Sequence, residues 1–73
     1  MKKKLKRFEL VLTREKWERE MTRDEFFTRG FVECEDAKFA IAVCKDWVST
    51  QPGWQALGVK FAGTKDEWVW DGN

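Results

Sequence analysis

The sequence predicts an α+β domain of two layers, in which one helix packs on one face of a small, mostly antiparallel sheet (β-β-α-β-β). Three patterns predict this fold. Residues 5–13 and 57–61 show the two-residue period of strands, and residues 37–50 carry an apolar stripe with the period of a helix. At 73 residues the chain is expected to be a single domain, with flexible ends at residues 1–4 and 71–73.

The first strand is predicted over residues 5–13. Phe8, Leu10 and Leu12 occupy alternate positions, so all three point to the same face of a strand. This pattern is typical of a strand that is buried on one side only. We expect this side to meet the helix.

The segment at residues 14–29 contains conflicting signals. The motif Thr22-Arg-Asp-Glu25 spells a capping box, which is typical of a helix start. A helix here would have a poor apolar face, however. We therefore favour a long twisted hairpin with its tip within residues 15–24 and a second strand at residues 25–34, in which Gly30 marks a bulge or a close approach. The helical alternative remains open.

The clearest element is a helix at about residues 37–50. Asp36 precedes it and can accept a hydrogen bond from the free N–H groups of the first turn. Pro52 ends it, because proline has no N–H and disfavours the helical conformation in the residue before it. Phe39 and Val43 are expected to widen the apolar stripe. The stripe consists of Ala37, Ala40, Ile41, Cys44, Trp47 and Val48.

After the helix, a third strand is predicted in which Leu57, Val59 and Phe61 cover the helix. Residues 67–70 would form a short fourth strand or an extended tail. Trp68 and Trp70 stand two positions apart, so in a strand they would share one face.

Tryptophan and acidic side chains are concentrated near the end of the chain. Tryptophan is enriched where the binding energy of protein interfaces is concentrated, so we predict a partner-binding patch with an acidic rim. Its residues are Trp54, Trp68, Trp70, Asp66, Glu67 and Asp71. The alternative is that the indole rings close a thin core.

Most enzyme chemistries lack their usual residues in this chain. Histidine is absent, which removes the commonest general acid–base group and the commonest metal ligand. Cys34 and Cys44 have no third soft ligand near them in the sequence and are interpreted as small buried core residues. The glycines are scattered, so no phosphate-cradling loop is formed. We expect no catalytic activity, no metal and no cofactor.

The amino-terminal part of the chain is basic. Residues 1–30 carry ten Lys and Arg against six Asp and Glu, whereas residues 31–73 carry four against seven. A basic run can contact phosphates, and aromatic side chains of the hairpin can stack on bases. This combination predicts a nucleic-acid-binding accessory module as an alternative function. The basic run is Lys2, Lys3, Lys4, Lys6 and Arg7, and the hairpin aromatics are Phe8, Trp17, Phe26 and Phe27.

The longest uninterrupted apolar stretch is Phe39–Cys44, six residues, which is too short to span a bilayer. Two cysteines do not make a disulfide framework, and free thiols suit a reducing compartment. We therefore expect a cytoplasmic protein without membrane contact.

The run Phe31-Val-Glu-Cys-Glu-Asp-Ala-Lys-Phe-Ala-Ile-Ala, followed by Trp47 and the strand at residues 57–61, resembles the layout of small phage-encoded inhibitors of host proteins, of the anti-CRISPR and RNA-polymerase-inhibitor types. The likeness covers roughly residues 26–62 and transfers no binding residue. It implies a non-catalytic inhibitor that blocks a defence or transcription protein, or a ribonucleoprotein complex, in the cytoplasm of a bacterial host. A homodimer that pairs exposed strand edges is compatible with either function.

Overall fold

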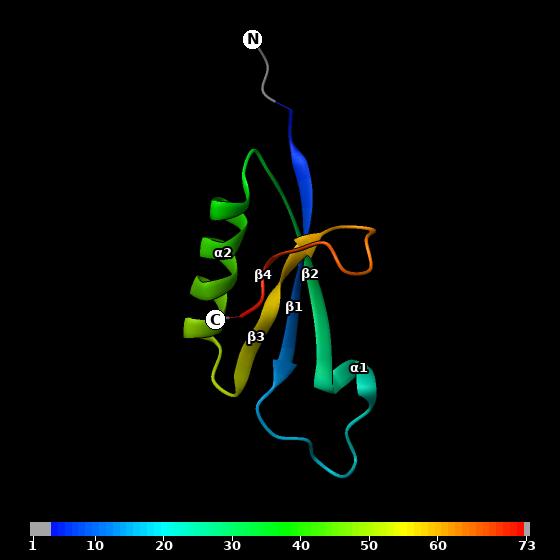
Figure 1. Cartoon of the computed structure of the whole chain (residues 1–73). Helices are drawn as coiled ribbons and strands as arrows, with labels where there is room; N and C mark the ends of the chain where they lie inside the picture. The colour runs from blue at the N-terminus through cyan, green and yellow to red at the C-terminus, as the bar shows by residue number, and fades with distance from the viewer. Residues whose placement is uncertain (1–3, 73) are drawn as a thin grey trace.

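The computed structural model describes residues 4–72. Its elements are β1 (Lys6–Arg14), α1 (Arg23–Phe26), β2 (Phe27–Cys34), α2 (Ala37–Thr50), β3 (Trp54–Phe61) and β4 (Trp68–Trp70). The strands form one antiparallel sheet in the order β2-β1-β3-β4. Figure 1 shows α2 along one side of this sheet, while α1 and the connection from β3 to β4 lie toward the other side. The α+β fold predicted from the sequence is confirmed.

The core lies between α2 and the sheet. The alternation in β1 is confirmed, because Phe8, Leu10 and Leu12 are all buried on this side. Ala40 and Cys44 stand one helical turn apart and both face the sheet, so the helix can approach it closely through small side chains. The buried core comprises Phe8, Leu10, Leu12, Cys34, Ala40, Cys44 and Val59.

The segment between β1 and β2 contains both of the structures that its sequence suggests. β1 and β2 pair antiparallel from Lys6 opposite Cys34 to Thr13 opposite Phe27, which confirms the hairpin. The second strand starts at Phe27 and not at residue 25, because residues 23–26 form α1. The Thr22 hydroxyl accepts a hydrogen bond from the Glu25 N–H (3.2 Å), and the Glu25 carboxylate accepts one from the Thr22 N–H (2.6 Å). The capping box therefore prevails over strand alternation at this point.

Helix α2 has the bounds that the sequence predicts. The Asp36 carboxylate accepts a hydrogen bond from the Phe39 N–H (3.0 Å), and Gln51, just before Pro52, caps the other end. Phe39 does not widen the apolar stripe as expected, because its side chain is 58% exposed. It precedes Ala40 and so points about 100° away from the line of residues that faces the sheet.

A bulge in β3 changes which of its side chains face α2. Leu57 and Gly58 of β3 lie opposite the single residue Val11 of β1, so Leu57 is the extra residue. The prediction that Leu57 covers the helix together with Val59 is therefore wrong. Val59 is fully buried beneath α2, whereas Leu57 is 39% exposed and lines a groove on the opposite face.

Trp68 and Trp70 lie on opposite faces of the sheet, so the prediction that they share a face is also wrong. The register between β3 and β4 shifts, and Trp70 pairs with Val59 while Trp68 pairs with Lys60. Val59 and Lys60 are neighbours in β3 and point to opposite sides of the sheet, so the rings of their partners Trp70 and Trp68 are separated as well. Trp70 lies toward α2, where the Lys45 Nζ is 5.2 Å from its ring centroid.

The glycine that permits a close approach is Gly58 and not Gly30. Gly30 pairs with Leu10 in an uninterrupted register, so the bulge predicted there is absent. At Gly58, which has a φ of 157°, an added Cβ would overlap the carbonyl oxygen of Trp70 and lie 2.9 Å from two ring carbons of Trp68. The absence of a side chain at Gly58 lets β4 cross β3 with the Trp68 ring against the sheet.

Of the ends for which flexibility is predicted, residues 1–3 and 73 lie outside the described residues. Gly72 is half-buried beside β3, where an added Cβ would lie 2.8 Å from the Leu57 carbonyl oxygen. Within residues 4–72, no helix has the length and apolar character needed to cross a bilayer.

Candidate functional site

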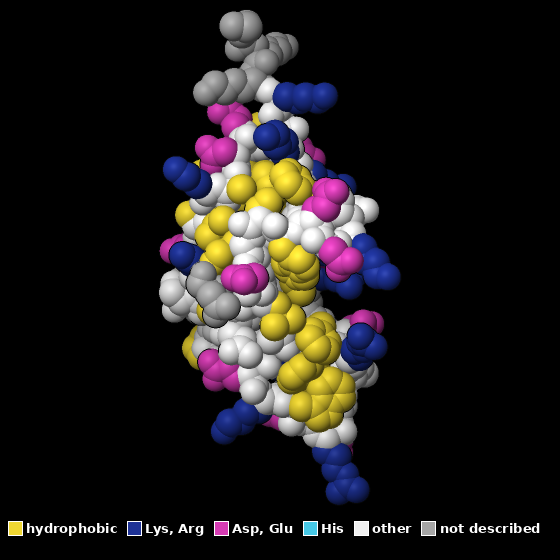
Figure 2. Space-filling view, viewed as in Figure 1, with side chains coloured by type: hydrophobic (Ala, Val, Ile, Leu, Met, Phe, Trp, Pro, Cys, Tyr) yellow, Lys and Arg dark blue, Asp and Glu magenta, His cyan; other side chains and the backbone are white. Residues whose placement is uncertain are grey.

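The face of the sheet opposite α2, which we call the open face, carries most of the exposed large apolar side chains of the sheet. Four of them keep 37% to 52% of their surface exposed: Phe27, Leu57, Trp68 and Phe31. Residues on this side include Arg7, Glu9, Val11, Thr13, Arg23, Phe27, Arg29, Phe31, Glu33, Leu57, Lys60 and Trp68. Figure 2, which has β3 and β4 toward the viewer, shows hydrophobic side chains reaching the surface in a band between charged ones on this side of the molecule. Clustering of this kind on one face marks a binding surface more often than scattered exposure does.

Cationic side chains lie over the exposed aromatic rings. The guanidinium carbon of Arg7 is 4.5 Å from the centroid of the Phe31 ring, and the Lys60 Nζ is 5.5 Å from that of Trp68. A cation over a ring face is attracted by the ring quadrupole, by about 0.5–1 kcal/mol at an exposed site. These contacts give the open face a mixed aromatic and cationic character.

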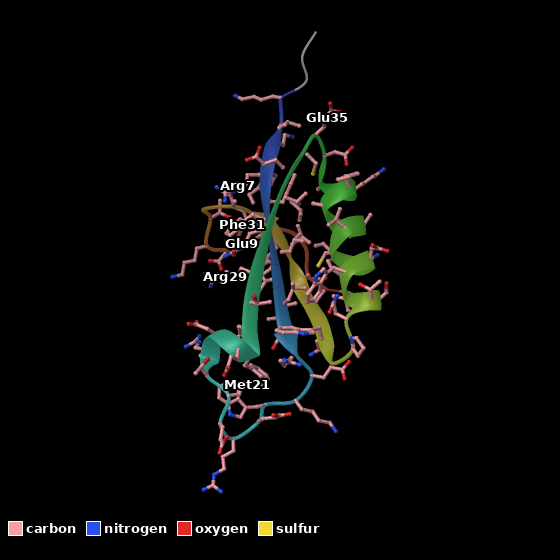
Figure 3. All side chains as sticks on the ribbon, turned by 180° about the vertical axis from the view of Figure 1, so that it is seen from behind. Arg7, Glu9, Met21, Arg29, Phe31 and Glu35 are labelled. Atoms are coloured by element: carbon pink, nitrogen blue, oxygen red, sulfur yellow. The ribbon has the colours of Figure 1, made fainter. Side chains whose placement is uncertain are left out.

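Glu9 lies at the centre of the open face and is 6% exposed. Its Oε2 atom is 3.4 Å from the Lys60 Nζ and 3.7 Å from the Arg29 Nε, and it has no hydrogen-bond partner that satisfies ideal geometry. A buried carboxylate needs a compensating charge, so Glu9 holds both cations close to the sheet. Figure 3 shows Glu9 with Arg29, Arg7 and Phe31 on the side of the hairpin that faces away from α2.

A groove of about 500 Å³ crosses the open face between α1 and β4. Val11 and Leu57 contribute aliphatic surface, and Phe27 and Trp68 contribute aromatic surface. The charged groups that line it are Arg23, Asp24 and Arg29. The groove is thus apolar in part, with both signs of charge beside it, and has room for side chains of a partner.

The structure does not bring the three predicted tryptophans together. Trp54 is half-buried and packs edge-on against Trp47 of α2, with a centroid distance of 5.7 Å. The Arg14 guanidinium lies over the Trp54 ring at 4.8 Å. Only Trp68 of the three lies on the open face, so Trp54 and Trp70 have the packing role that was the alternative interpretation.

The acidic residues predicted to rim the patch are all exposed. Asp66 and Glu67 lie in the turn before β4, and Asp71 follows that strand. The turn is closed by backbone hydrogen bonds from the Phe61 N–H to the Glu67 carbonyl and from the Trp68 N–H to the Asp66 carbonyl, both 3.0 Å. Asp66 and Glu67 therefore stand next to Trp68 at one border of the open face.

The basic start of the chain divides between the two faces. Arg7 lies on the open face over Phe31, whereas Lys6 pairs with Cys34 on the α2 side. Lys4 is exposed, and Lys2 and Lys3 lie outside the described residues. The described part of this run therefore does not form one continuous basic surface.

The hairpin aromatics predicted to stack on bases also lie in different parts of the structure. Phe8 is 1% exposed in the core and is unavailable for stacking. Trp17 and Phe26 pack edge-on at 4.8 Å beside the loop before α1. Only Phe27 lies on the open face, where the Arg23 guanidinium is 5.9 Å from its ring centroid.

The sequence reasoning missed Phe31, Arg29 and Leu57 as site residues. A usable signal was present for the first two, since Phe27, Arg29 and Phe31 occupy alternate positions of one strand. No such signal existed for Leu57, because its position depends on the bulge.

Both cysteines belong to the core. Cys34 and Cys44 are both buried, and burial raises the pKa of the Cys44 thiol. The Cys34 thiol donates a hydrogen bond to the Asp36 carbonyl oxygen at 3.1 Å. Among the described residues, no three Cys, Asp or Glu side chains are grouped closely enough to hold a metal ion.

Comparison of the chain with protein-family models, with curated proteins and with solved structures finds no match.

Proposed function

We propose that the chain is a non-catalytic protein-binding module that docks onto a partner protein through its open face. The observation that supports this most strongly is the clustering of Phe27, Phe31, Leu57 and Trp68, each at least 37% exposed, on one side of a sheet whose other side is covered. Leaving these side chains in water has a cost that a partner surface would remove.

The residue types of the open face also fit a protein partner. Aromatic residues and arginine are enriched at the centres of protein interfaces and carry most of their binding energy. Arg7 and Arg29 stand beside Phe31 on this face, and the border near Trp68 is acidic. The acidic groups offset much of the positive charge, which favours a protein surface of mixed charge over a polyphosphate.

The alternative is a single-stranded nucleic acid that stacks on the same rings. The cations over Phe31, Phe27 and Trp68 favour it, because bases stack on aromatic rings while cations contact phosphates. The buried carboxylate of Glu9 at the centre of the face opposes it. This alternative requires an affinity for oligonucleotides that falls steeply with salt.

The resemblance in layout to small phage inhibitors indicates how such a module would act. A chain of this size that covers a functional surface of a host defence or transcription protein blocks it stoichiometrically, without turnover. Occupation of the surface is then the whole mechanism.

The test uses two aromatic residues of similar exposure on different faces. Phe31 on the open face is 52% exposed and Phe39 on α2 is 58% exposed, so replacing either by alanine removes little core packing. The tagged protein is used to isolate partners from bacterial lysate, and the affinity of each purified partner is measured for wild type, Phe31→Ala and Phe39→Ala. We expect Phe31→Ala to weaken binding about thirty-fold, the effect of a residue worth about 2 kcal/mol, and Phe39→Ala to leave it unchanged.

Two outcomes would contradict the proposal. If circular dichroism shows that Phe31→Ala is folded and its affinity equals that of wild type, the open face does not bind the partner. Retention of single-stranded oligonucleotides at low salt, lost in Phe31→Ala but not in Phe39→Ala, would assign the same face to nucleic acid instead.

A further inference from the structure

Among residues 4–72, no strand pairs with the outer edge of β2. β2 pairs with β1 on one side only and ends the sheet. It is eight residues long, from Phe27 to Cys34, and contains no proline. In the described part of the chain, none of the backbone hydrogen bonds formed outside the regular elements involves residues 28–34. Figure 3, which views the molecule from behind, shows β2 in front of β1 with no other element over it.

A long exposed edge is a template for adding another strand, and natural proteins usually blunt it with charge or cover it. The opposite edge, β4, spans only three residues. β2 carries two charged side chains, Arg29 and Glu33, both exposed and both on the open face. They have opposite signs and lie symmetrically about Phe31, two positions on either side.

We propose that β2 pairs with β2 of a second copy of this chain, antiparallel and centred on Phe31. Directly opposite residues of an antiparallel pair lie on the same face of the sheet. In this register Arg29 therefore lies opposite the partner's Glu33, and Glu33 lies opposite the partner's Arg29. Phe31 lies opposite the partner's Phe31. The charges that would repel a random strand thus become two attractive pairs in the self-complementary arrangement.

The register also agrees with the other face of the strand. Gly30 lies opposite the partner's Val32, and Thr28 lies opposite the partner's Cys34, so no charged group enters the α2 side. A register centred on Gly30 would instead place Arg29 opposite the partner's Phe31 and Glu33 opposite the partner's Phe27, without any ion pair. Charge complementarity therefore selects the register centred on Phe31.

The dimer would join two sheets into one of eight strands. Its open face would be continuous across the two-fold axis, with both Phe31 rings at the centre. This self-association uses the edge of β2, whereas the proposed partner binding uses the face of the sheet, so either can fail without the other.

The test combines two charge reversals on the full chain. Sedimentation equilibrium from about 1 µM to about 1 mM is expected to show a wild-type dimer. Arg29→Glu places Glu opposite Glu twice, and Glu33→Arg places Arg opposite Arg twice. The dissociation constant of the dimer should be at least ten-fold higher for each variant alone than for wild type. An equimolar mixture of the two variants should dimerise again, because every pair in the heterodimer is attractive.

Arg29→Glu also brings a carboxylate near Glu9, so its fold is checked by circular dichroism. Glu33→Arg leaves the Glu9 contacts intact, so it tests the dimer by itself if Arg29→Glu unfolds. A wild-type chain that stays monomeric up to about 1 mM would overturn the proposal. So would a dimer that Glu33→Arg does not weaken, or two folded variants that weaken it singly and show no recovery when mixed.

Discussion

Replacing Gly58 by alanine is expected to destabilise the protein strongly, because two effects add at this position. The new Cβ would overlap the Trp70 carbonyl oxygen and lie 2.9 Å from Cε3 and Cζ3 of the Trp68 ring. Backbone atoms cannot rotate away, so β4 must shift from β3. Overpacking of this kind costs about 1–3 kcal/mol, and the φ of 157° adds conformational strain. We expect a total loss of about 3 kcal/mol in the free energy of unfolding.

Gly63 and Gly30 provide matched controls, because alanine is expected to lower the free energy of unfolding slightly at Gly63 and to leave it unchanged or raise it at Gly30. Gly63 has a φ of 79° and open space around its Cβ position, so Gly63→Ala should cost only the left-handed strain of about 1 kcal/mol. Gly30 has an ordinary strand conformation, and its Cβ would meet only Leu10 side-chain atoms at 3.8 and 3.9 Å. Gly30→Ala should therefore be neutral or stabilise by up to about 1 kcal/mol, because alanine restricts the unfolded chain.

Urea unfolding followed by far-ultraviolet circular dichroism measures all three variants. In thermal unfolding, 1 kcal/mol corresponds to about 4–8 °C for a domain of this size, so Gly58→Ala should lower Tm by roughly 12–24 °C. A Gly58→Ala variant as stable as Gly30→Ala would refute the close approach of β4 to β3. The separation of Trp68 from Trp70 would then lose its basis.

Three further perturbations test other parts of the structure. Glu9→Gln leaves the Lys60 ammonium without its counter-charge, and the Lys60 side chain is only 13% exposed. The free energy of unfolding measured in urea should therefore decrease by about 2 kcal/mol. An unchanged urea midpoint would contradict the central role of Glu9. Thr22→Ala removes one hydrogen bond of the capping box and should cost about 1 kcal/mol, with faster amide hydrogen exchange at Glu25 and unchanged exchange in α2. Burial raises the pKa of the Cys44 thiol, so above about pH 8.5 the thiol ionises in the unfolded chain before it does in the folded one. The free energy of unfolding of the wild type should therefore decrease between roughly pH 8 and pH 10. That of Cys44→Ala should decrease less over the same range.

Local signals determined much of the fold. The bounds of α2 follow from the cap at Asp36 and the break at Pro52, which act through hydrogen bonds and sterics within a few residues. The buried side of β1 follows from alternation alone, and the capping box marked α1 even though its surroundings favoured a strand.

Local signals place some residues of the candidate site on one face, but its exposure depends on contacts between distant segments. Whether Phe31 is exposed depends on which element, if any, covers β2, and this follows from the strand order β2-β1-β3-β4. Alternation places Phe27, Arg29 and Phe31 on one face, but it does not say whether this face meets α2 or solvent.

By itself the sequence determined the fold class, the helix and the side of β1 that enters the core, because each depends on the period or on a capping group of a short segment. The tertiary structure decided where the tryptophans lie. The bulge at Leu57 and the register shift that separates Trp68 from Trp70 arise only when β3 pairs with β1 and β4. Pairing between distant segments sets the register of a sheet, and a shift of one residue moves a side chain to the other face.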